Sequence, residues 1–110
     1  MAYYSGSVDY EEGFPLGGNL VSQSKTAAAD TYYIGMPLAY NDTNDNYEYS
    51  ATAPEIISME AKTLSAEGSL LCAVSGTEWL QSGIVDDSGA ALTLTDDFIH
   101  TALTNGLVLR

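Results

Sequence analysis

The sequence is poor in the side chains on which catalysis and cross-linking depend. Its 110 residues include one cysteine, Cys72, and one histidine, His100. A lone cysteine excludes a disulfide within the chain and a zinc site with paired cysteines, and it is typical of a protein that folds in a reducing compartment. The chain also lacks a P-loop, a dinucleotide-binding glycine motif and a nucleophile elbow. We therefore predict a protein without catalytic residues, bound metal or cofactor.

Positive charge is also scarce. Three bases, Lys25, Lys62 and Arg110, stand against 15 acidic residues, so the net charge is −12. Nucleic-acid phosphates repel such a chain unless its bases gather in one patch, so we expect no nucleic-acid partner. The chain has no run of about 18 apolar residues, and residues 1–6 lack the basic and apolar regions of a signal peptide. These absences predict a protein that neither spans a membrane nor is exported.

The first 30 residues differ from the rest of the chain. Their apolar side chains follow neither the helical period of 3.6 nor the strand period of 2. We predict a flexible N-terminal arm over residues 1–30 and a β-rich domain over residues 31–110. A plain linker tail is the alternative, but glycine and serine dominate linkers. This arm instead carries apolar side chains suited to binding a partner: Tyr3, Tyr4, Tyr10, Phe14 and Leu16.

Strand and turn signals fill the chain from residue 31 onward. Thr31–Tyr40 is rich in aromatic and branched residues, and its Gly35 and Pro37 indicate a bulge or a sheet edge. The run Asn41–Asn46 predicts a turn, because Asn and Asp tolerate left-handed backbone, and a hairpin into Tyr47–Ala51 follows. Further strands are expected at Glu55–Ala61, Ser69–Val74, Gly83–Asp86 and Ala90–Leu94, the last two joined by a tight turn.

One helix is predicted near the C-terminus, over residues 96–105. Thr95 can cap it, and Asp96 and Asp97 place negative charge at its positive end. Residues 107–110 then resume as a strand. The fold class is therefore mainly β, in the α+β sense. We expect a small β-barrel or sandwich-like domain with one short C-terminal helix and an extended N-terminal arm.

The residues with reactive or metal-binding side chains have simpler explanations. A Cys72–His100 dyad is conceivable, but Cys72 lies in an apolar run typical of a buried strand, and His100 lies off the apolar stripe of the helix. The pair Asp86/Asp87 would point to opposite faces of a strand, which does not suit a glycosidase. The pair Asp96/Asp97 is explained by the helix dipole.

The Asp42–Asn46 segment begins like a calcium-binding loop, with hard oxygen ligands at alternate positions. The match fails further on, because Tyr47 stands at the sixth position where glycine is needed, and Ala53 at the twelfth where a bidentate glutamate is needed. We therefore predict a solvated turn. The single tryptophan, Trp79, has two interpretations: it roofs a small core, or it anchors an oligomer interface, where tryptophan is enriched.

Three segments carry a family resemblance. They are ADTYYIGMPL at residues 29–38, GIVDDSGAALT at residues 83–93 and LTNGLVL at residues 103–109. With a loose N-terminal segment and a late helix, the chain resembles the small decoration, or cement, proteins of tailed-phage heads, including the lambda head decoration family.

The resemblance implies a non-enzymatic structural protein of the virion, made in the host cytoplasm and placed on the outer capsid surface. It implies a homotrimer that clamps neighbouring subunits of the major capsid protein. In that setting Tyr3, Tyr4, Tyr10, Phe14 and Leu16 would bind the capsid.

Two other classes remain open at this point. The acidic balance would suit a DNA-mimic inhibitor, although its carboxylates concentrate in turns and at a helix start rather than along one face. The eight tyrosines would suit an adhesion module on the virion surface.

Overall fold

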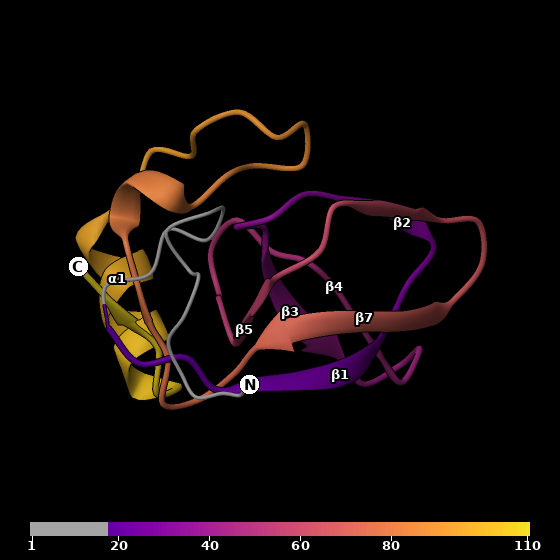
Figure 1. The fold of residues 1–110 in the computed structure, drawn as a ribbon, viewed down its shortest axis with the longest axis horizontal. Helices are drawn as coiled ribbons and strands as arrows, with labels where there is room; N and C mark the ends of the chain where they lie inside the picture. The colour runs from indigo at the N-terminus through magenta and orange to yellow at the C-terminus, as the bar shows by residue number, and fades with distance from the viewer. Residues whose placement is uncertain (1–17) are drawn as a thin grey trace.

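The computed structural model describes residues 18–110, which fold around a small β-barrel (Figure 1). Residues 1–17 of the predicted arm lie outside this description. Five strands close the barrel in the order β1-β4-β3-β5-β7. They are β1 (Ser22–Ala27), β3 (Pro37–Asn41), β4 (Asn46–Tyr49), β5 (Ile56–Ser58) and β7 (Gly68–Ala73).

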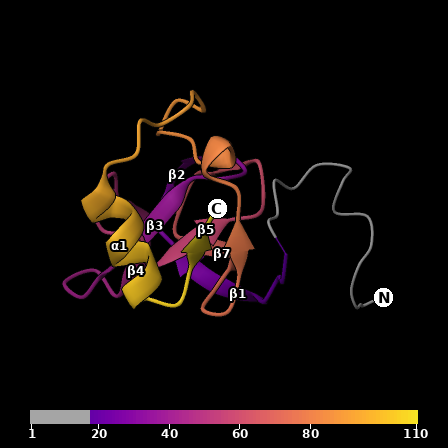
Figure 2. The same cartoon turned by 90° about the vertical axis from the view of Figure 1, so that its left-hand side faces the viewer.

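Two further strand pairs and one helix complete the described chain. β2 (Asp30–Tyr32) pairs antiparallel with β6 (Lys62–Leu64), and β8 (Glu78–Trp79) pairs parallel with β9 (Val108–Leu109). A 3-10 turn, η2 (Gln81–Gly83), follows β8. The helix α1 (Asp96–Thr104) lies at one end of the barrel, and Figure 2 looks onto that end. The predicted fold class, mainly β with one short C-terminal helix, is confirmed.

Local hydrogen bonds explain the two elements that the sequence predicted best. The Thr95 hydroxyl accepts a hydrogen bond from the Phe98 N–H at 3.1 Å, which starts α1 one residue after the cap. In the hairpin of β3 and β4, the Asn41 side-chain oxygen accepts from the N–H groups of Thr43 and Asn44. Asp45 takes the left-handed conformation, with φ of 56°, that closes this turn.

The strand expected over Thr31–Tyr40 is two strands, β2 and β3. A turn at Tyr33–Met36 separates them, closed by a hydrogen bond from Met36 N to Tyr33 O at 3.1 Å. Gly35 occupies its left-handed position, with φ of 97°, and a Cβ there would lie 2.0 Å from the carbonyl oxygen of Gly83. The glycine that suggested a bulge is therefore a chain reversal packed against a distant loop.

The predicted boundary between arm and domain at residue 30 is too late. β1 lies wholly within the predicted arm, yet it pairs with β7 through six residue pairs from Ser22↔Ala73 to Ala27↔Gly68. The sequence hides this strand because most of its side chains are exposed, so it has no alternation of apolar and polar residues. The folded domain thus includes residues 18–30.

The segment expected as two strands, Gly83–Asp86 and Ala90–Leu94, is largely a loop. Its only ladder pairing is the isolated bridge Val85↔Ala91. The Asp86 carboxylate holds the turn between them by accepting hydrogen bonds from the N–H groups of Ser88 and Ala90 and from the Ser88 hydroxyl. The Asp86 side chain thus holds this turn in place of the backbone hydrogen bonds of a longer hairpin.

Two buried clusters share the β5–β7 wall. The helix-side core contains Ile57, Met59, Ala73, Trp79, Ile84, Phe98, Ala102, Leu107 and Leu109. The barrel core contains Ala27, Tyr32, Met36, Leu38, Ile56, Leu70 and Cys72. Successive residues of a strand point to opposite faces, so Ile56 and Ile57 enter different cores, as do Cys72 and Ala73.

Candidate binding surface

The candidate catalytic residues are placed where they have structural roles. Cys72 is fully buried in the barrel core, and burial raises the pKa of its thiol to about 12. It is therefore protonated at neutral pH and a poor nucleophile. His100 is exposed on α1, as its position off the apolar stripe predicts. Within residues 18–110, no group of three or more His, Cys, Asp and Glu side chains is arranged to hold a metal ion.

The paired carboxylates also have structural explanations. Backbone and side-chain hydrogen bonds from Ser88 lower the pKa of Asp86, which serves the turn described above. Asp96 and Asp97 occupy the first turn of α1, where the helix dipole favours negative charge. Residues 42–45 are exposed in the β3–β4 turn.

Trp79, a candidate for the oligomer interface, lies in the helix-side core instead. Its side chain has no exposed surface, and its indole Nε1 donates a hydrogen bond to the Gly83 carbonyl at 3.3 Å. Of the two interpretations of this residue, the structure supports the core. The other candidate residues, Tyr3, Tyr4, Tyr10, Phe14 and Leu16, lie outside the described residues.

The two edges of β1 are paired unequally, a feature that the sequence did not reveal. One edge is paired with β7 along the whole strand, and the two lie side by side in Figure 1. On the other edge, the described strands pair with β1 only at Ala27↔Tyr47 of β4. Among the described strands, the barrel is therefore closed at the C-terminal end of β1, and the rest of this edge has no described partner strand.

No described strand pairs with the backbone of this edge before Ala27. A hydrogen bond from Val74 N to Val21 O (2.8 Å) sets the phase of the β1–β7 ladder, in which alternate residues direct their backbone groups to opposite edges. The N–H and C=O groups of Ser22 and Ser24 therefore point away from β7. We call this open edge, from Ser22 to Thr26, the β1 seam.

A cavity of about 380 Å³ opens beside the β1 seam. Its lining includes Gln23 and Lys25 of β1, Tyr47 of β4, the apolar side chains of Ile56 and Val74, and Glu55. Lys25 pairs with Leu70 across the ladder and Gln23 pairs with Cys72, so these polar side chains share the sheet face that carries the barrel core.

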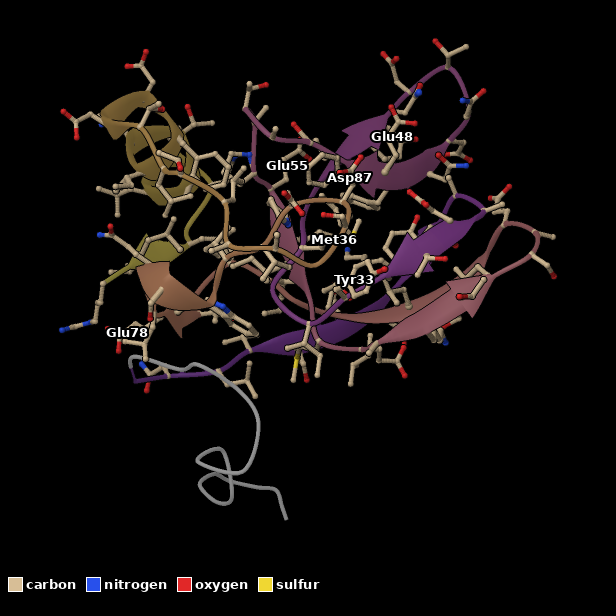
Figure 3. The ribbon with its side chains drawn as sticks, turned by 90° about the horizontal axis from the view of Figure 1, so that it is seen from above. Tyr33, Met36, Glu48, Glu55, Glu78 and Asp87 are labelled. Carbon is tan, nitrogen blue, oxygen red and sulfur yellow. The ribbon has the colours of Figure 1, made fainter. Side chains whose placement is uncertain are left out.

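Lys25 is the base without an ion-pair partner among the described residues. The Lys62 ammonium lies 3.2 Å from Glu60, and the Arg110 guanidinium lies 3.2 Å from Glu78. Lys25 instead lies over the Tyr47 ring, 5.7 Å from its centroid. Figure 3 shows Glu78 near one side of the molecule, well away from Glu48 and Glu55.

Neither the family comparisons nor the structural ones identify a relative. The chain matches no protein-family model, no curated protein and no solved structure. Within the described part of the chain, no helix has both the length and the apolar character needed to cross a membrane.

Proposed function

We propose that this chain is a non-enzymatic capsid decoration protein that binds the outer surface of a tailed-phage head and stabilises contacts between major capsid subunits. One observation carries the proposal: the three segments that resemble the decoration proteins pack together. Val85 N donates to Gly35 O at 3.1 Å, which joins residues 29–38 to residues 83–93. Ile84 and Leu107 share the helix-side core, which joins the third segment, residues 103–109, to the other two. The resemblance thus falls on one packed unit instead of on scattered common patterns.

The mechanism assigns capsid binding to the N-terminal arm. Burying Tyr3, Tyr4, Tyr10, Phe14 and Leu16 would contribute about 10 kcal/mol, and ordering the arm would cost at least as much. Net affinity then needs main-chain pairing, with the arm added as a strand to a capsid sheet. It also needs three arms of a homotrimer engaging together at high effective concentration.

The test removes the arm and leaves the described domain in place. Mature tailed-phage heads without their own decoration protein are incubated with the full chain, and with a variant in which a Gly/Ser sequence of equal length replaces residues 1–16. We expect occupancy of the heads by the variant to fall to background while its far-UV circular dichroism stays that of the folded β-rich domain. Equal occupancy by the two proteins would refute the proposal.

Salt dependence separates this proposal from DNA mimicry. A clamp held by apolar and main-chain contacts should stay bound when the salt concentration rises. A DNA mimic would bind a DNA-processing enzyme and weaken steeply with salt, because its contacts are charge pairs.

A further inference from the structure

We propose that the β1 seam accepts a strand from a second copy of this chain, formed by residues 9–13, with Asp9 and Glu11 facing Lys25. The proposal extends the proposed function, of which self-association is one part, and it names the contact through which copies associate. It requires no capsid and is tested without one.

The backbone of the β1 seam defines the geometry of the acceptor. Ser22 and Ser24 are exposed, and their N–H and C=O groups point away from β7, as shown above. An exposed strand edge is a template for another strand. Of residues 22–26, Ser22, Ser24 and Thr26 direct backbone groups to this edge, and Thr26 adjoins the bridge to β4 at Ala27. The added strand would continue the barrel wall where β4 pairs with β1 only at Ala27.

Charge selects the donor. Lys25 lines the cavity beside the seam without an ion-pair partner among the described residues. Residues 1–17 contain three acidic side chains, Asp9, Glu11 and Glu12, and neither lysine nor arginine. Glu55 also lines the cavity, from the segment that leads into β5. An acidic strand lying along β1 would pass next to Lys25. A uniformly acidic ligand that filled the whole cavity would also contact Glu55, which would repel it.

Because side chains alternate between the two faces of the donor strand, its aromatic side chains would stay free to contact another partner. In an extended strand, side chains two residues apart share a face. Asp9 and Glu11 would therefore face the cavity together, while Tyr10, Glu12 and Phe14 would face outward. A copy could hold its neighbour through carboxylates and still present aromatic rings to another partner.

The geometry excludes the shortest fold-back within one copy and leaves the arm long enough to reach a second copy. A tight two-residue turn at Gly17–Gly18 would require hydrogen bonds between Leu16 and Asn19. The Asn19 backbone is already bonded to Glu78, with its C=O accepting from Glu78 N at 2.8 Å and its N–H donating to the Glu78 carboxylate at 3.1 Å. Seventeen extended residues reach about 55 Å, and the longest dimension of the molecule is 35 Å.

Donation of this kind is head-to-tail, because the donor and acceptor surfaces differ. Head-to-tail contacts close into a ring when their rotation allows it. A ring of three copies would give the homotrimer that the proposed function includes.

The test traps the exchange with cysteines in the full chain. In a Cys72→Ala background, a donor with Glu12→Cys is mixed at micromolar concentration with a larger, tagged acceptor carrying Ser24→Cys. Both cysteines face outward in the proposed pairing. We expect at least about tenfold more mixed disulfide than with a matched acceptor carrying Thr63→Cys, because docked cysteines react at high effective concentration. Thr63 is exposed on β6, which belongs to the separate two-stranded sheet with β2.

Charge reversal then tests the role of Lys25. Adding Lys25→Glu to the acceptor should lower the mixed disulfide several-fold, and Glu11→Lys in the donor should restore it. Lys62→Glu, which removes a lysine paired with Glu60, is the matched control and should leave the yield unchanged. Circular dichroism confirms that each variant is folded.

Three results would overturn the inference: a yield no higher than with Thr63→Cys, a yield insensitive to Lys25→Glu, or a disulfide formed within one copy when Glu12→Cys and Ser24→Cys share a chain. Failure here is distinct from failure of the proposed function. Chains that exchange strands but do not bind heads would refute the capsid proposal only, and chains that bind heads without exchange would refute this inference only.

Discussion

The helix-side core and the barrel core are both buried, but they differ in the polarity of their side chains and in the strand edge that lies beside them. The helix-side core surrounds Trp79 with apolar side chains such as Phe98 and Leu107, and α1 lies at that end of the molecule (Figure 2). The barrel core contains two members with polar groups, Tyr32 and Cys72, and it lies behind the β1 seam. Burial raises the pKa of Tyr32 to about 12, and its hydroxyl donates to the Ala28 carbonyl at 2.6 Å.

This difference suggests a division of roles, with the helix-side core providing stability and the barrel side providing a binding edge. The two cores share the β5–β7 wall, so stabilising one side also holds the other. A domain of about 90 described residues without a disulfide has a small stability margin, and the helix-side core, which contains Trp79, can supply much of it. The barrel side is then free to keep an unpaired edge. The predictions below test this comparison.

The largest expected effect is at Trp79. Trp79→Ala should lower the free energy of unfolding by about 3–5 kcal/mol, because it removes the largest fully buried side chain and leaves a cavity in the helix-side core. Urea unfolding followed by circular dichroism measures the change. Leu103→Ala on α1, at a side chain that is 55% exposed, is the control and should cost less than about 1 kcal/mol. Equal effects of the two variants would place the stability elsewhere.

A smaller effect is expected at Cys72 in the barrel core. Cys72→Ser should lower the free energy of unfolding by about 1–3 kcal/mol, because it buries a hydroxyl among apolar side chains. Cys72→Ala, measured in the same urea series, separates the loss of volume from the burial of the hydroxyl. If serine costs no more than alanine, the barrel core tolerates a polar group, and the prediction fails.

The smallest effect is expected at Glu60, which ties the segment after β5 to β7. Its carboxylate accepts a hydrogen bond from Leu71 N at 2.8 Å, and that bond, with help from Lys62, lowers the pKa of Glu60. The folded protein therefore holds this proton less tightly than the unfolded chain. The stabilisation is present at neutral pH and is lost as the pH falls through the lowered pKa.

Glu60→Gln should therefore lower the melting temperature at pH 7. The loss in the free energy of unfolding should be less than about 1 kcal/mol, because the group is partly exposed. The gap between the variant and the natural chain should shrink as the pH falls from 7 to 3. Glu67→Gln, at an exposed side chain, is the control for the loss of one negative charge. A gap that widens toward acid pH would contradict the assigned hydrogen bond.

The elements predicted correctly from the sequence are those whose signals are local. The Asn41–Asn46 turn is closed by the side chain of Asn41 acting on residues two and three positions away. Helix α1 begins at the Thr95 cap and ends within one residue of its predicted end. The burial of Cys72 and the exposure of His100 also follow from patterns within a few residues.

Tertiary structure decided the features that depend on residues far apart in the chain. β1 is polar on both faces, so only its pairing with β7, more than 40 residues later in the sequence, makes it a strand. Trp79 enters a core because β8 meets β9 near the C-terminus. The β1 seam exists because β4 meets β1 at Ala27 and no described strand pairs with its remaining edge. Pairing between distant segments is a property of the packed chain, and local sequence patterns carry little information about it.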